Sequence, residues 1–120
     1  MQTLTKAEEV IMNCIWKLND NVEVVDVMKR LKEESGKEYA RTTVCVFMSF
    51  LRDKGYVGFI KRGHTYIYHP LISREEYQKE NVGELLSKSF DDSIPEMINV
   101  IFSVRKPSEE EKKAIREMLA

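Results

Sequence analysis

The 120-residue chain is poor in the residue types that usually carry catalysis or metal binding. It has two cysteines, two histidines, one tryptophan, three prolines and five glycines. Cys14 and Cys45 have no further cysteine or histidine at metal-ligand spacing, and neither His64 nor His69 is paired with a nearby cysteine or serine nucleophile. No glycine-rich phosphate-binding loop is present. We therefore expect no enzyme activity, no bound metal and no cofactor.

Long apolar runs are also missing. A membrane span needs about 20 consecutive apolar residues, and no stretch of the sequence approaches that length. The first residues lack the basic segment and apolar core of a secretory signal. We expect a cytoplasmic protein without membrane insertion, in which a structural disulfide would be unusual. Packing as small apolar side chains is the favoured role of Cys14 and Cys45, and redox sensing by Cys45 is the weaker alternative.

The chain lacks a net positive charge, which at first argues against binding to nucleic acid. Its formal net charge is −1. The distribution is uneven, because residues 1–72 carry 11 basic and 9 acidic residues, whereas residues 73–120 carry 8 basic and 11 acidic residues. Residues 39–66 hold five basic residues against the single acidic Asp53. Such a local patch is sufficient to meet phosphates, because the relevant field acts within about 8 Å in physiological salt.

Helical periodicity accounts for most of the first 54 residues. We expect a first helix that begins at a capping box of Thr5 and Glu8 and ends before Asn19, followed by helices at 24–34 and 41–54. Their expected inward residues are Val10, Ile11, Cys14, Ile15 and Leu18 in the first helix, Val24, Val27, Met28 and Leu31 in the second, and Val44, Phe47, Met48 and Leu51 in the third.

A β-hairpin is expected directly after the third helix. Residues 55–60 and 65–69 alternate in character and are rich in aromatic side chains, which predicts two strands. Residues 61–64, Lys-Arg-Gly-His, would form the turn between them. Three helices followed by a two-stranded hairpin is the order of a winged helix-turn-helix domain, which we place at residues 1–72.

The remaining residues, 73–120, are expected to form a helical dimerisation domain. Periodicity and capping residues predict helices at 74–90 and 94–102 and a third that begins at Ser108. Three short apolar helices cannot close a core alone, so we expect them to intertwine with a second copy of the chain. The alternative is that they pack on the winged domain of the same chain. The expected dimerisation residues are Leu85, Leu86, Phe90, Ile94, Met97, Ile98, Ile101, Phe102, Ile115 and Leu119.

The third helix and the hairpin carry the residues expected to bind DNA. The outward helix face is small and nearly uncharged in its first two turns, as suits a helix that lies against a groove floor. Hydroxyls and cations would reach phosphates or base edges, and methyl groups would contact thymine methyls. Each feature alone fits a helix cap or a solvated turn, but their order and spacing favour DNA binding. The expected residues are Arg41, Thr42, Thr43, Val46, Ser49, Lys54, Lys61, Arg62 and His64.

These segments resemble the penicillinase repressor family, which includes the methicillin-resistance and copper-transport repressors. The resemblance covers nearly the whole chain, and the matching pieces are LTKAEEVIMNCIWKL, ARTTVCVFMSFLRDKGYV, KRGHTYIYHPLISREEY, FDDSIPEMI and SEEEKKAIREML. It implies a homodimeric repressor whose winged domains bind a palindromic double-stranded DNA operator and whose C-terminal helices hold the dimer. The matching DNA-contact positions are Thr42, Thr43 and the wing around Arg62 and Gly63. The alternative function is a winged-helix protein–protein adaptor with weakened DNA binding.

Three departures from the family pattern bear on function. Val46 and Phe50 stand where the family commonly has threonine and arginine, so operator preference or affinity is expected to differ. Antibiotic-responsive members are cut by a membrane sensor protease at an Asn-Phe bond in the second tail helix. Val100-Ile101 stand there in this chain, with Asn99 one residue early, which argues against that partner. Copper-responsive members carry a C-terminal cysteine cluster, and this chain has no cysteine after Cys45.

Overall fold

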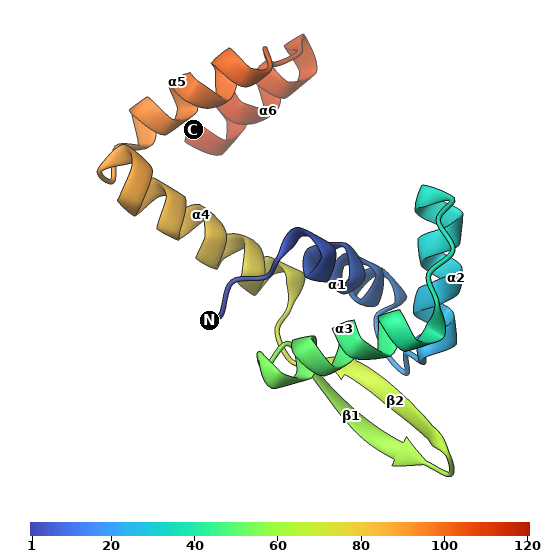
Figure 1. Cartoon of the computed structure of the whole chain (residues 1–120). Helices are drawn as coiled ribbons and strands as arrows, with labels where there is room; N and C mark the ends of the chain where they lie inside the picture. The colour runs from blue at the N-terminus through green and yellow to red at the C-terminus, as the bar shows by residue number, and fades with distance from the viewer. The chain divides into compact units, whose positions relative to one another are not determined.

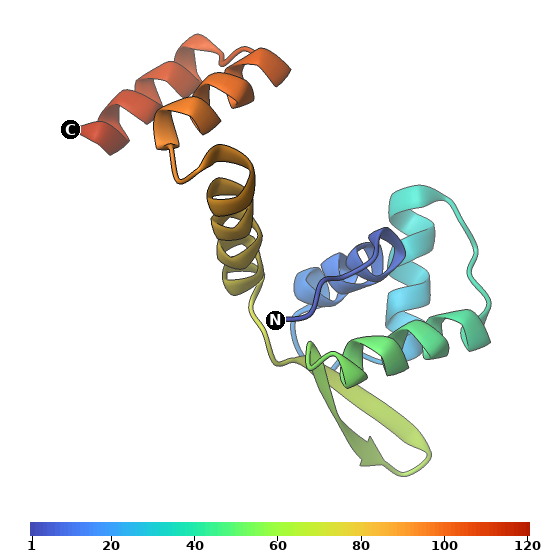
Figure 2. The ribbon, with the colours of Figure 1, turned by 60° about the vertical axis from the view of Figure 1, so that its left-hand side comes forward.

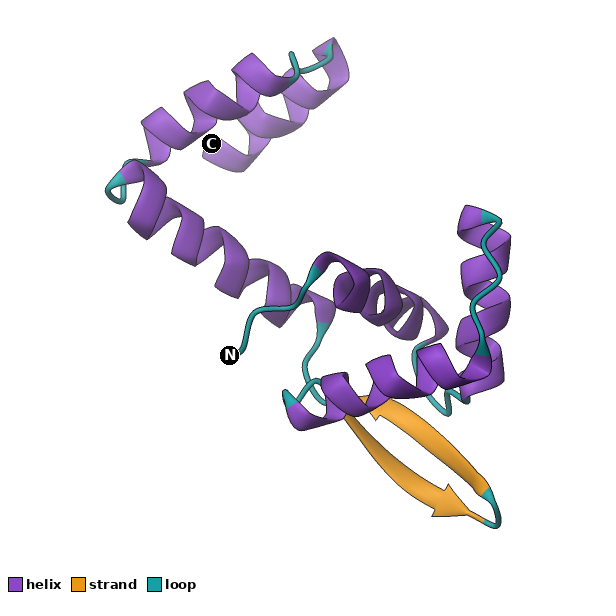
Figure 3. Cartoon of the chain, in the orientation of Figure 1, coloured by secondary structure: helices purple, strands orange, loops and turns teal.

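The structure is a computed structural model that describes all 120 residues of the chain. It contains six α-helices and one two-stranded antiparallel sheet (Figures 1 and 3). The expected fold class, mainly helical with a small hairpin, is therefore confirmed. The elements are α1 (Lys6–Leu18), α2 (Val24–Ser35), α3 (Arg41–Asp53), β1 (Val57–Arg62), β2 (Thr65–Pro70), α4 (Arg74–Phe90), α5 (Ile94–Val104) and α6 (Glu109–Leu119).

The chain divides into two compact units, Met1–Gln78 and Lys79–Ala120. The first unit extends past residue 72, because Tyr77 is buried in its core. The Tyr77 ring lies 5.2 Å from that of Trp16 and 5.8 Å from that of Tyr56, measured between centroids. Its hydroxyl also donates a hydrogen bond to the carboxylate of Glu9. The first turn of α4 therefore belongs to the packed part of the first unit.

The core of the first unit lies where α1, α2 and α3 pack against one another (Figures 1 and 2). Most of the expected inward residues are buried, but the prediction was wrong for Val10, which is 45% exposed. Met12 is fully buried in its place. The buried stripe of α1 runs through Glu8, Ile11, Met12 and Ile15 at helical spacing. Its first member is a charged residue, a type that is usually found on the surface.

Glu8 is buried because two neighbours satisfy its carboxylate. Only 2% of the residue is exposed. One carboxylate oxygen accepts hydrogen bonds from Lys54 Nζ at 2.6 Å and from the backbone N–H of Thr5 at 2.8 Å, and the latter completes the expected capping box. Lys54 Nζ also donates to the Thr3 carbonyl at 2.9 Å. Burial raises the pKa of Glu8, but the hydrogen bonds from Lys54 and Thr5 outweigh it and hold the pKa below its usual value.

Replacing Glu8 with glutamine is expected to lower the free energy of unfolding by about 1–3 kcal/mol near neutral pH, because Lys54 loses its charge partner. A carboxyl with a lowered pKa in the folded state stabilises above its unfolded-state pKa, and this contribution is lost as pH falls through the folded-state pKa. The difference between wild type and Glu8→Gln should therefore be largest near neutral pH and shrink as the pH is lowered below about 4.5 in urea unfolding. The exposed Glu33, replaced by glutamine, is the control; an equal, pH-independent effect of both variants would contradict this account.

The hairpin is longer and its turn tighter than the sequence indicated. The strands pair from Val57 opposite Pro70 to Arg62 opposite Thr65. Lys61 and Arg62 therefore lie in β1, and the expected four-residue turn is wrong: only Gly63 and His64 connect the strands. Gly63 has a φ of +66°, which suits the first central position of a type II′ turn, a geometry that matches the twist of paired strands.

A short bridge ties the hairpin to the helices. Val22, between α1 and α2, exchanges two backbone hydrogen bonds with Tyr68 of β2, at 3.0 and 2.7 Å. At its base, Tyr56 and Val57 are buried in the helical core. The hairpin of β1 and β2, called the wing below, is thus anchored at its base, while its tip extends beyond the helices. Figures 1 and 2 both place that tip on the side of the N-terminal end of α3.

The second unit is a set of helices with little buried surface of its own. Two of its helices begin at the predicted capping residues: Ser93 caps α5, and a capping box of Ser108 and Glu111 begins α6. The sequence prediction ended α5 at residue 102, and the helix continues to Val104. No residue of α5 or α6 is buried, and the expected dimerisation residues are all exposed or half-buried. Each of the six helices is too short or too polar to span a membrane.

Candidate nucleic-acid interface

The N-terminal end of α3 is uncapped and carries exposed polar side chains. Ala40 stands at the capping position, and no side chain accepts a hydrogen bond from the first backbone N–H groups of the helix. A helix cap is therefore excluded as the role of Thr42 and Thr43, which are exposed beside Arg41 in the first turn. Free N–H groups and the positive end of the helix dipole favour an anion such as a phosphate.

The middle of the outward α3 face is apolar. Val46 is 50% exposed and Phe50 is 47% exposed. Between them, the Ser49 hydroxyl donates a hydrogen bond to the Cys45 carbonyl at 3.1 Å. The Ser49 oxygen can still accept a hydrogen bond, but its hydrogen is already used. This part of the helix thus offers methyl and aromatic groups rather than hydrogen-bond donors.

The wing carries its cations on two different faces. Lys61 and Arg62 are both exposed and are neighbours on β1, so their side chains leave opposite faces of the hairpin. Lys61 Nζ lies 6.0 Å from the ring centroid of Tyr66, its cross-strand partner. Arg62 makes no ion pair and stands opposite Thr65, next to the turn that contains the exposed His64. The two cations can therefore contact different phosphates.

Lys61 shares its hairpin face with aromatic residues that the sequence analysis did not select. Phe59 and Tyr66 are exposed, and their rings meet edge to face with centroids 5.1 Å apart. The guanidinium of Arg52, from the last turn of α3, lies 5.7 Å from the Phe59 centroid. This contact joins the hairpin face to α3. The alternation of β1 was the signal that could have grouped Phe59 with Lys61.

Two of the basic residues near the site are already paired. Lys54, an expected DNA-binding residue, is held by Glu8 and the Thr3 carbonyl at the C-terminal end of α3, so we leave it out of the candidate interface. Arg52 forms an ion pair with Asp53 at 3.2 Å. Arg41, Lys61 and Arg62 make no ion pair and remain available at the helix start and wing. The candidate interface therefore comprises Arg41, Thr42, Thr43, Val46, Ser49, Lys61, Arg62 and His64, with Ser49 as an acceptor only.

Comparison with known proteins assigns this chain to a protein family. The family model for the penicillinase repressor matches residues 4–120. The chain belongs to the penicillinase repressor family. This confirms the resemblance stated from the sequence and assigns the chain to a class of DNA-binding repressors rather than a class of enzymes. A comparison with curated protein sequences returns no significant match.

Among the solved structures that resemble the chain, a repressor's DNA-binding domain supports the winged-helix fold. The solution structure of the DNA-binding domain of the repressor BlaI is 26% identical, with coverage of 64% of this chain and 94% of that chain and a TM-score of 0.52. Monomeric Bacillus licheniformis BlaI in complex with the blaP half-operator is 26% identical, with coverage of 63% and 89% and a TM-score of 0.49. A complex structure of hsRosR-S1 is 14% identical, with coverage of 97% and 88% and a TM-score of 0.56, and it shows similarity of fold alone.

Proposed function

We propose that this penicillinase repressor family member represses transcription as a homodimer on a palindromic DNA operator. The observation that carries the proposal is the group of three exposed, unpaired cations, Arg41, Lys61 and Arg62, at the uncapped start of α3 and the end of β1. Cations without a protein partner are free to replace the counterions of phosphates, which is the main source of DNA affinity. The likeness to a repressor domain described as DNA-binding supports the same proposal.

In the proposed complex, α3 lies in the major groove and the hairpin follows the flanking backbone. The start of α3 holds a phosphate through its N–H groups and Arg41. The apolar Val46 and the methyl groups of Thr42 and Thr43 then meet thymine methyls, which are unique to the major groove. This composition favours A·T base pairs under the first two turns of the helix. Arg62 and Lys61 fix the register through phosphates on either side of the wing.

The second unit supplies the proposed dimer interface. Its apolar side chains line an open hollow of about 350 Å³ formed by Leu85, Phe90, Met97, Val100, Ile101, Val104 and Arg105. Leu85, Val100, Ile101 and Val104 of this hollow are exposed, and a contiguous group of exposed apolar side chains is typical of an association site. A two-fold dimer would present two α3 helices to half-sites about 34 Å apart, one turn of the double helix.

The proposal is tested by measuring binding of the full-length protein to DNA from the region upstream of its own gene. Fluorescence anisotropy at several salt concentrations should show specific binding that weakens as salt rises, in proportion to the number of phosphate contacts. A scrambled duplex of equal composition is the control. Absence of specific binding at low salt would refute the proposed function.

A second candidate function is a protein–protein adaptor with weakened DNA binding. The exposed Val46 and Phe50 favour it, because a family position that commonly holds arginine is occupied by an aromatic ring. The same anisotropy experiment separates the two functions. An adaptor would bind the upstream duplex no better than the scrambled one.

A further inference from the structure

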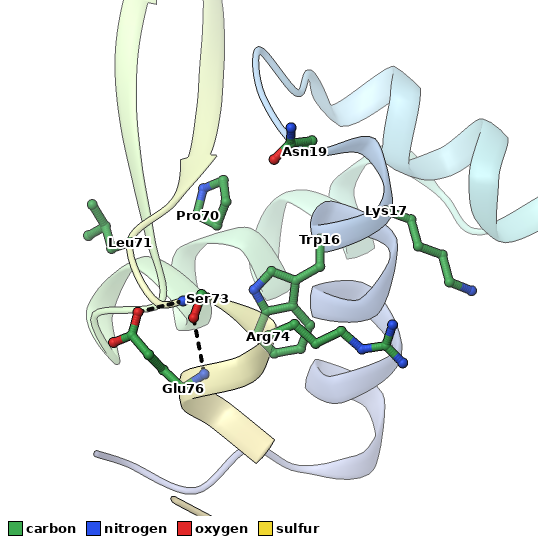
Figure 4. Close-up of a pocket in the computed structure, with 8 residues that line it drawn as sticks. All are labelled: Trp16, Lys17, Asn19, Pro70, Leu71, Ser73, Arg74 and Glu76. Carbon is green, nitrogen blue, oxygen red and sulfur yellow. Dashed lines mark hydrogen bonds between the residues drawn. The ribbon is translucent and has the colours of Figure 1, made fainter. Parts of the chain in front are cut away.

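A pocket of about 480 Å³ lies between the C-terminal part of α1 and the segment that leads from β2 into α4 (Figure 4). Its volume falls within the range of pockets that hold small molecules, about 300–1,000 Å³. None of its residues belongs to the proposed DNA interface. The walls combine an aromatic ring, apolar side chains and charged groups: Trp16, Lys17, Asn19, Pro70, Leu71, Ser73, Arg74 and Glu76.

The aromatic wall of the pocket is held in place. The indole N–H of Trp16 donates a hydrogen bond to the Ile72 carbonyl at 2.8 Å. The ring also packs against Tyr77, with centroids 5.2 Å apart. Trp16 lies off the apolar stripe predicted for the first helix, and in the structure it packs half-buried against the core of the first unit. A ring fixed on two sides is a preorganised surface for a flat apolar or aromatic ligand.

Most of the polar groups in the pocket are already engaged. Glu76 accepts from the backbone N–H of Ser73 at 3.2 Å and its own N–H donates to the Ser73 hydroxyl at 3.0 Å, so its carboxylate caps α4. Lys17 is paired with Glu34 at 3.0 Å. Arg74 makes no ion pair or side-chain hydrogen bond, and the Asn19 carboxamide makes none either. The groups free to bind a ligand are therefore a guanidinium and an amide.

We propose that this pocket binds a small aromatic carboxylate. The Arg74 guanidinium matches the fork geometry of a carboxylate and remains charged at any physiological pH. The Trp16 ring, which lies between Arg74 and Asn19 in the close-up (Figure 4), supplies a face for the aromatic body of the ligand. An occupant would brace residues 70–76, the segment through which the hairpin continues into α4. Binding at this pocket is independent of the proposed DNA-binding function.

Trp16 makes the test direct, because it is the only tryptophan in the chain. The full-length protein is titrated with sodium benzoate at constant ionic strength while Trp16 emission and the indole N–H NMR signal are recorded. Benzyl alcohol, a neutral analogue, and acetate, which lacks the ring, are titrated in parallel. We expect a saturable response to benzoate and a much weaker response to either control ligand.

Two variants assign the response to the proposed groups. Arg74→Gln should raise the Kd for benzoate about tenfold or more, because a charge-assisted hydrogen bond is lost. Arg116→Gln removes an equivalent exposed cation from α6 and should leave the Kd unchanged.

Circular dichroism confirms that each variant is folded. The proposal is overturned by the absence of a saturable benzoate response, by an equal response to benzyl alcohol, or by an unchanged Kd in Arg74→Gln. If Arg74→Gln loses helix, Arg74→Ala decides instead, because alanine favours helix, and an unchanged Kd in that variant overturns the proposal.

Discussion

Replacing Arg41 and Arg62 together with glutamine is expected to weaken operator binding at least about 100-fold at physiological salt, since each proposed charge-assisted contact to phosphate occurs twice in a dimer. Both side chains are exposed and unpaired, so the loss arises from DNA contacts rather than from the fold. The slope of log affinity against log salt should fall by about three to four, from four lost phosphate contacts. Fluorescence anisotropy across a salt series measures both quantities.

A matched pair of substitutions separates the effect of local phosphate contacts on operator affinity from the effect of the chain's total charge. Lys6→Gln with Lys113→Gln removes the same two charges from exposed positions at the start of α1 and in α6. This control should change operator affinity only slightly. Equal losses in both double variants would mean that general electrostatic attraction, and not the α3 start and the wing, accounts for binding.

Truncation after Gln78 is expected to yield a folded monomer whose operator affinity is lower by about 100-fold or more. The first unit keeps its core, including Tyr77, and the removed residues 79–120 hold the proposed dimer interface. A monomer loses the high effective concentration that joins the two half-site contacts in a dimer. Light scattering measures the mass of the truncated chain. Anisotropy measures its affinity for a full operator and for a half operator, and the affinity per half-site should be about equal for the two duplexes.

A substitution in the full-length chain tests the same dimer interface without removing any residues. Ile101→Asp places a charge on the exposed apolar face of α5 and should also give a monomer with native helix content. A truncated chain that remains dimeric would refute the assignment of the interface to the second unit.

Truncation after Ile72 should give a chain with a lower Tm than truncation after Gln78. The shorter chain lacks Tyr77 and its contacts to Trp16 and Tyr56.

Local chemistry in the sequence determined much of the architecture. Thr5 with Glu8, Ser93, and Ser108 with Glu111 begin three helices as expected, because a side-chain cap needs only residues within one turn. Alternation and Gly63 indicated the hairpin for the same reason. The exposure of the residues proposed to bind DNA, at the α3 start and on the wing, could also be predicted from the sequence, since it follows from helix and strand periodicity.

Only the tertiary structure decided which charged and aromatic residues are committed to partners distant in the sequence. Lys54 was expected to bind DNA, but 46 residues of chain separate it from Glu8, and their hydrogen bond depends on how α1 packs against α3. Tyr77 was placed in the tail, yet it completes a core with Trp16 and Tyr56. Periodicity describes one element at a time, whereas burial and charge pairing depend on the elements that pack around it.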